Sequence, residues 1–159
     1  MTKAIENAMI RCIPKGLCSW NYRLHAGGHS ARIEINWTSE QGALEIDGER
    51  YEIQKHGPLS GHWTLTAGSK QLASAKKISA FTRTIELDTE SGTVTLSAES
   101  AFGRTMLLAG AGFDAVIAPA HPFTRRASIT GTIGDFRTVC FAFWLTVLLW
   151  RRAAQSSHS

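Results

Sequence analysis

Most of the chain alternates apolar and polar residues with a period of two. The clearest alternating segments are residues 32–38, 62–67, 93–98 and 128–133. Such a period places successive side chains on opposite faces, as in a strand with one buried face. In the first segment, Ile33, Ile35 and Trp37 would share the inward face. The pattern therefore predicts half-buried antiparallel strands along most of the sequence.

Turn signals separate these segments. Asp47-Gly48 lies between two short alternating runs and matches a tight hairpin turn with positive φ. Ser91-Gly92 joins residues 84–88 to residues 93–97 in the same way. Repeated at intervals of about ten residues, these signals predict roughly ten to twelve short strands. The fold class is mainly β, either a barrel or a sandwich, and we expect residues 1–159 to form a single domain.

One segment departs from this pattern. Residues 139–150 read VCFAFWLTVLLW, which is apolar on every face of a helix. Asp135 could cap its N-terminus, and Arg151 and Arg152 would suit the negative end of the helix dipole. A membrane span needs about 20 apolar residues, whereas a run this short favours a core helix. We expect an enclosed helix at about 136–154, with a short tail anchor as the alternative.

The layout resembles the tubby C-terminal-like superfamily, which includes tubby domains, LURP-one-related proteins and phospholipid scramblases. The residues that carry the resemblance are 46–53, 61–65, 72–77, 81–87, 122–126 and the apolar C-terminal segment. The resemblance implies a closed antiparallel β-barrel that wraps a hydrophobic C-terminal α-helix. It also implies lipid or phosphate binding, because tubby domains bind phosphoinositides and scramblases act on membranes. The lipid-binding residues of those families cannot be matched to this sequence.

Charge and cysteine content narrow the location and the partners. The net charge is +4, and the basic excess lies beyond Glu99, where it consists of arginine. The three cysteines cannot all pair within one chain, and no secretory signal precedes the first strand. We therefore expect a cytoplasmic protein with reduced thiols, peripheral at a membrane if it binds lipid. Nucleic acid is not expected as a partner, because the basic residues are not interleaved with aromatic residues.

Two candidate motifs have weak support. Cys12, Cys18, His25 and His29 offer possible zinc ligands, but their spacing does not match a structural zinc site. Residues 110–115 have the spacing of a dinucleotide-binding loop, yet no helix pattern follows them. A glycine turn between strands explains that segment better. We expect no metal and no cofactor.

The remaining candidate is a site for an anionic ligand such as a phosphoinositide or phospholipid head group. The basic side chains that would bind it lie around a hairpin and before the last predicted strand: Lys76, Lys77, Arg83, Arg125 and Arg126. One of the two adjacent arginines would face inward if the strand included both. The alternatives are a structural or protein-interaction domain with no ligand and, third, an enzyme. No residue pattern identifies catalytic residues.

Overall fold

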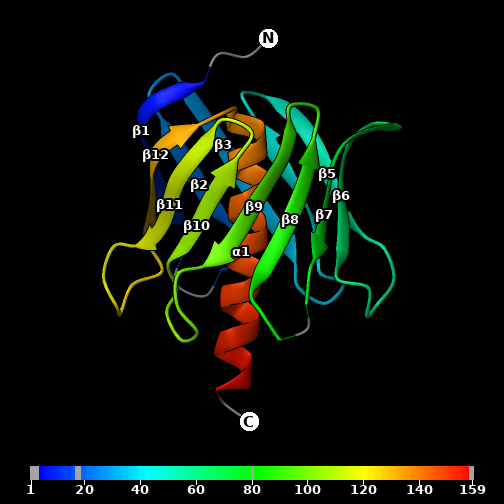
Figure 1. The fold of residues 1–159 in the computed structure, drawn as a ribbon, viewed down its shortest axis with the longest axis vertical. Helices are drawn as coiled ribbons and strands as arrows, with labels where there is room; N and C mark the ends of the chain where they lie inside the picture. Colours follow the sequence, from blue (N-terminus) through cyan, green and yellow to red (C-terminus); the bar gives the residue numbers. More distant parts are fainter. Residues whose placement is uncertain (1–3, 17–18, 80, 158–159) are drawn as a thin grey trace.

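Twelve antiparallel strands close into a barrel around one helix (Figure 1). The structure is a computed structural model and describes residues 4–16, 19–79 and 81–157. The strands are β1 (Ile5–Pro14), β2 (Tyr22–Ala26), β3 (His29–Asn36), β4 (Gln41–Ile46), β5 (Glu49–Lys55), β6 (His62–Ala67), β7 (Lys70–Lys77), β8 (Thr84–Thr89), β9 (Gly92–Ala98), β10 (Met106–Gly110), β11 (Phe113–Pro119) and β12 (Ala127–Ile133). Each strand pairs with its neighbours in sequence, and β1 closes the ring by pairing with β12. The predicted β-barrel is confirmed.

The two ends of the barrel differ in the length of their connections. Every even-numbered strand is followed by a two-residue connection, whereas every odd-numbered strand is followed by one of four to seven residues. In an up-and-down barrel all connections of one parity lie at the same end, as Figure 1 shows. We call these ends the turn end and the loop end. Asp47 and Gly48 have φ of 48° and 87°, which confirms the predicted primed turn, and Ala111-Gly112 is a turn between strands.

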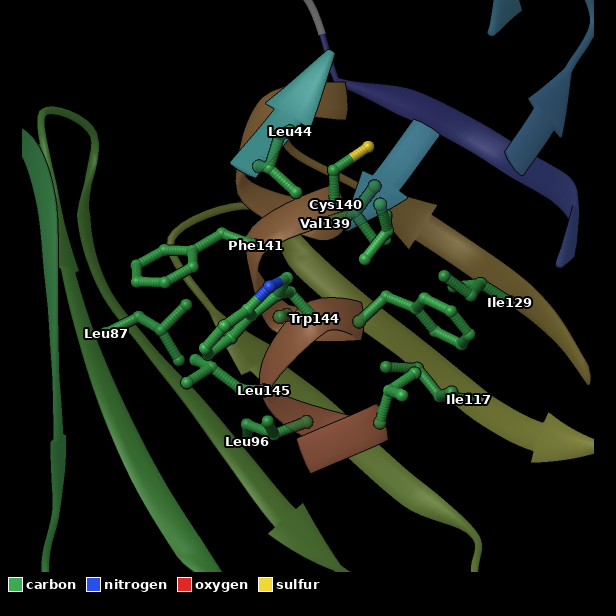
Figure 2. Close-up of a cluster of buried hydrophobic side chains, with 14 of the residues drawn as sticks. Leu44, Leu87, Leu96, Ile117, Ile129, Val139, Cys140, Phe141, Trp144 and Leu145 are labelled. Atoms are coloured by element: carbon green, nitrogen blue, oxygen red, sulfur yellow. The ribbon is translucent and has the colours of Figure 1, made fainter. Parts of the chain in front are cut away.

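The helix α1 (Phe136–Ser156) enters the barrel at the turn end and runs along its interior to the loop end. Every residue from Thr138 to Arg151 is buried. In Figure 2, side chains of α1 meet apolar side chains from strands on different walls of the barrel, so the helix supplies the centre of the core. The one buried hydroxyl in its middle, that of Thr146, donates to the Ala142 carbonyl at 2.9 Å. Within the described residues, no helix has the length and apolar character needed to cross a bilayer.

A direct contact fixes the depth of the helix in the barrel. The indole Nε1 of Trp144 donates to the carbonyl oxygen of Glu34 on β3 at 3.0 Å. Gly42 on β4 leaves the space for this contact, because a Cβ there would lie 2.0 Å from that oxygen and 2.8 Å from the indole nitrogen. Because Gly42 on β4 has no side chain, Trp144 on α1 can reach the backbone of the neighbouring strand β3 and hydrogen-bond to it.

Two details differ from the sequence-based expectations, and a third agrees with them. The helix continues to Ser156, so Arg151 and Arg152 are not in its last turn and do not act on the end of the helix dipole. Asp135 caps the N-terminus as expected, accepting from the Thr138 backbone N–H at 2.7 Å. Trp37 lies just beyond β3 and is exposed, because the strand ends at Asn36 before the alternation reaches it.

Replacement of Leu145, which lies fully buried on α1, by aspartate tests the enclosed helix. We expect Leu145→Asp to destabilise the protein by about 5 kcal/mol or more, since a buried unpaired charge can cost as much as a domain's whole stability. Circular dichroism during urea unfolding measures this loss. Ala153→Asp, at an exposed position of the same helix, is the control and should unfold like the wild type. A cooperatively folded Leu145→Asp protein would contradict enclosure.

The space at Gly42 gives a second stability test. Gly42→Ala should lower the free energy of unfolding by about 2–3 kcal/mol, because the new methyl group collides with backbone and not with a flexible side chain. Gly28→Ala is the matched control, since a Cβ there meets nothing within 4 Å and the residue is not in the left-handed region. Equal stabilities of the two variants would show that Trp144 does not depend on this space.

Candidate functional site

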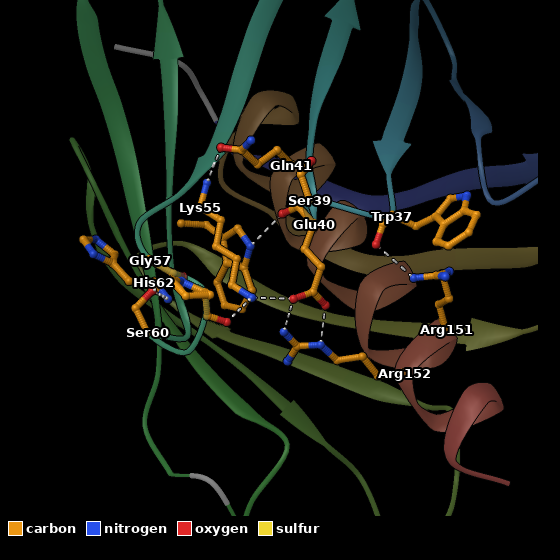
Figure 3. Close-up of polar contacts among 12 residues, drawn as sticks. Trp37, Ser39, Glu40, Gln41, Lys55, Gly57, Ser60, His62, Arg151 and Arg152 are labelled. Atoms are coloured by element: carbon orange, nitrogen blue, oxygen red, sulfur yellow. Dashed lines mark hydrogen bonds and ion pairs between the residues drawn. The ribbon is translucent and has the colours of Figure 1, made fainter. Parts of the chain in front are cut away.

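Glu40 organises the polar contacts at the loop end of the barrel (Figure 3). It ends the connection between β3 and β4 and adopts a φ of 55°, which is uncommon for a residue with a side chain. Its carboxylate accepts two hydrogen bonds from the Arg152 guanidinium, at 2.6 and 2.7 Å. The same carboxylate accepts a hydrogen bond from Lys55 Nζ, and the Glu40 carbonyl accepts one from the Trp63 indole at 3.1 Å. One residue therefore joins α1 to two strands of the wall.

These contacts keep Glu40 ionised. The hydrogen bonds from Arg152, followed by those from Lys55, lower the pKa of the Glu40 carboxyl group to about 2, although burial acts in the opposite direction. Lys55 also donates to the Pro58 carbonyl at 3.0 Å and is nearly buried. Because one carboxylate faces two cations, the cluster carries net positive charge.

A cavity of about 300 Å³ opens beside this cluster. Its lining combines three cations with small and polar residues of two loops: Lys55, Pro58, Leu59, Ser60, Gly61, Lys77, Ser79 and Arg152. Burial, and then the charge of Arg152, lowers the pKa of Lys77. Among the described residues, Lys77 has no ion-pair partner within 4.0 Å. The cavity therefore contains a cation whose charge is not locally balanced. Beside it lies the Ser79 hydroxyl, which accepts from the Phe81 backbone N–H and can still donate, whereas the Ser60 hydroxyl donates to the Gly57 carbonyl at 3.2 Å.

A larger cavity of about 710 Å³ lies on the other side of Glu40, between the Trp37 loop and α1. Its charged groups are already satisfied. The Arg151 guanidinium lies 4.2 Å from the Trp37 ring centroid and donates to the Trp37 carbonyl at 3.3 Å. Lys55 is shared with the smaller cavity and is occupied by Glu40. For an anion, the smaller cavity is the better candidate because Lys77 faces it.

The structure places the predicted site residues on two distant parts of the barrel. Lys76 and Lys77 end β7, with Lys76 exposed on the outer face. Arg83 follows in the next loop and donates to the Ser100 carbonyl. Arg125 and Arg126 precede β12, which is five strands from β7 in a ring of twelve, almost opposite. All five residues lie towards the loop end, but no single small ligand could contact both groups.

Arg125 and Arg126 differ in their surroundings, although neither faces the barrel interior from a strand. The strand begins at Ala127, so neither Arg125 nor Arg126 is part of it. Arg125 is half-buried and donates to the carbonyls of Ser19 and Gly16, the latter at 2.7 Å, while its guanidinium lies 5.7 Å from the Trp20 ring centroid. Arg126 is exposed. Arg125 therefore fixes a loop in position, and Arg126 is the available charge of the pair.

Sequence reasoning missed Lys55 and assigned a different role to Arg152. Neither residue is near Lys77 in the sequence, and the three come together because α1 crosses the barrel and leaves it beside β5 and β7. The only available signal was that an arginine directly after an apolar buried segment must emerge near a carboxylate or water. It did not reveal that the carboxylate belongs to Glu40.

The other candidate chemistry is dispersed. Cys12 points into the core, whereas His25 on the paired strand points outward, and Cys18 lies outside the described residues. In the described part of the chain, no three His, Cys, Asp or Glu residues gather around a possible metal position. The histidines at the start of the β5–β6 loop and of β6 stack at 4.8 Å, and His56 contacts the Thr64 hydroxyl at 2.7 Å.

No protein-family model matches this chain, and neither does any curated protein or solved structure. The resemblance to the tubby-like superfamily therefore stays a prediction. The closed barrel with its central helix is observed directly in this structure.

The Glu40 cluster gives a prediction for the pH dependence of stability. Because the pKa of Glu40 is lowered from 4.5 to about 2, its contribution to stability is complete above about pH 4.5 and is lost as the pH falls towards 2. Glu40→Gln should cost about 2 kcal/mol at neutral pH, since hydrogen bonds to charged groups contribute about 1.5–3 kcal/mol. The difference in unfolding free energy between wild type and Glu40→Gln, measured by urea titration, should shrink over this window. A difference that is independent of pH would exclude the ionised cluster.

Proposed function

We propose that this chain is a non-enzymatic binding module for an anionic group, such as the phosphorylated head group of a phosphoinositide or phospholipid. The cavity lined by Lys55, Lys77 and Arg152 is where the module binds it. The observation that supports this most is Lys77, a partly buried cation with a lowered pKa and no ion-pair partner among the described residues.

An anion in this cavity would relieve an unfavourable charge arrangement. Lys77 and Arg152 repel one another, and Glu40 is occupied by Arg152 and Lys55. A phosphate near Lys77 would supply the missing negative charge and could accept a hydrogen bond from Ser79, which also lines the cavity. The fixed position of Arg152 favours this role, because a preorganised guanidinium loses little conformational freedom on binding.

Titration calorimetry with inositol 1,4,5-trisphosphate, a soluble probe for a phosphorylated head group, tests this proposal. Lys77→Ala should weaken binding by about ten- to a hundredfold, because a charge-assisted hydrogen bond contributes about 1.5–3 kcal/mol. Lys70→Ala is the matched control: Lys70 begins the same strand at the turn end, is exposed and lies 3.7 Å from Glu90, so its loss should leave binding unchanged.

The outcome depends on comparing the two lysines. Equal weakening by both substitutions would indicate general attraction to a basic protein and would contradict the cavity. No heat of binding at low salt, where charge attraction is strongest, would reject the anionic ligand altogether.

A further inference from the structure

The loop end displays large apolar side chains that contact little of the protein. Leu59, Phe81, Phe102 and Phe123 are each 97–100% exposed, and each lies in a different connection that follows an odd-numbered strand. Trp37 and Ile78, which are more than half exposed, also lie in these connections. We call these six side chains the apolar tips. The other large apolar residues recorded as exposed in the described chain, Ile5 and Met9, lie on the wall strand β1.

Four of the six apolar tips have an arginine close behind them. Arg83, Arg104 and Arg125 each follow a tip phenylalanine by two residues, and Arg151 stacks on Trp37. Arg104 is fixed by the carbonyls of Thr124 and Pro122, at 2.8 and 2.9 Å, so the loop that carries Phe123 is supported from the next loop. The three phenylalanine tips and Trp37 therefore stand beside arginines that backbone carbonyls hold in position.

Charge separates the two ends of the barrel. Among the described residues, the charged side chains in the turn-end connections are acidic, namely Asp47, Glu90 and Asp135, and the start of α1 adds one cation, Arg137. The loop-end connections and the end of α1 carry Lys15, Arg83, Arg104, Arg125, Arg126 and Arg152, while Arg151 is buried. Their acidic residues are Glu40, which is neutralised by Arg152 and Lys55, and Glu99. A surface that meets the loop end therefore encounters apolar groups and positive charge together.

We infer that the loop end is a membrane-docking face whose apolar tips enter the interface of an anionic lipid bilayer. This inference deepens the proposed function and rests on it for the preference for anionic head groups. The apolar tips are distributed over five loops around the rim, with Ile78 and Phe81 in the same one, as Figure 1 shows for the loops themselves. A fluid bilayer can receive separated side chains, whereas a folded partner protein needs a continuous complementary surface.

The same geometry argues against a second copy as the occupant. Two loop ends facing one another would bring like charges together, which opposes association. The basic groups on opposite walls at β7 and β12 cannot bind one small ligand, but a planar anionic surface can contact both. The end of α1, which extends past the loops in Figure 1, contains no acidic residue and so does not repel such a surface.

Vesicle sedimentation tests the inference with phosphatidylcholine vesicles that contain or lack phosphatidylserine. The wild type should bind the anionic vesicles, and part of this binding should persist in high salt, because insertion of apolar groups is not screened. Phe102→Ser combined with Phe123→Ser should weaken binding at least about tenfold. Met9→Ser is the control, since it removes an exposed apolar side chain from the wall and should not change binding.

Insertion has a direct signature as well. Phe102→Trp places an additional indole at a fully exposed tip, and brominated lipid should quench this added fluorescence when vesicles bind. Phe102 and Phe123 are almost fully exposed, so their replacement by serine or tryptophan removes no buried contact. Thermal unfolding of these variants should therefore match that of the wild type.

Three results would overturn the inference. Vesicle binding that is lost in Lys77→Ala but unchanged in the double phenylalanine variant would assign all binding to the head-group cavity. Binding of inositol 1,4,5-trisphosphate without any vesicle association would reject the docking face and leave the proposed function intact. A dimer detected by light scattering, and abolished by the double variant, would identify a second copy as the occupant.

Discussion

A helix that is apolar on every face cannot remain in water, and the rest of this structure follows from the need to enclose it. Phe141, Phe143, Trp144 and Leu145 have no exposed surface. Burying each such side chain contributes about 1.5–3 kcal/mol. The strands present their inward residues to the helix from all sides, and closure of the sheet between β1 and β12 leaves no open edge. Core and wall therefore depend on one another.

Enclosure also determines where polar chemistry can occur. The helix can hydrogen-bond to the wall at few places, and Trp144 does so through the space left by Gly42. Where the helix emerges, Arg151 and Arg152 find Trp37 and Glu40 in a single loop. The contacts that fix the end of the helix thus also create the charged mouth of the barrel, and Lys77 borders that mouth without a balancing charge. In this structure the candidate site is a by-product of fixing the helix in place.

The strands, the turns and the helix could be predicted from the sequence because their signals are local, whereas closure into a barrel was expected only from the family resemblance. Alternation identifies the strands, Asp47-Gly48 identifies a turn by its backbone requirement, and Asp135 identifies the start of the helix. The candidate site could not be predicted in the same way. Lys55 and Arg152 meet only because the helix crosses the whole barrel, and Arg125 meets backbone carbonyls that leave no trace in the sequence. Trp37 shows the limit of alternation itself, which cannot indicate where a strand stops.

The order of elements along the chain has a consequence for synthesis. All twelve strands precede the helix that fills the barrel. As the chain leaves the ribosome, the strands therefore emerge before the helix that they enclose. Until α1 is made, inward residues such as Ile33, Leu65 and Leu96 have no helix to pack against. A partly made wall exposes apolar surface and unpaired strand edges, which are the features that cause aggregation during folding. Completion of the native state must wait for residues near Trp144, so the nascent chain depends on delayed collapse or on chaperones until the last segment appears.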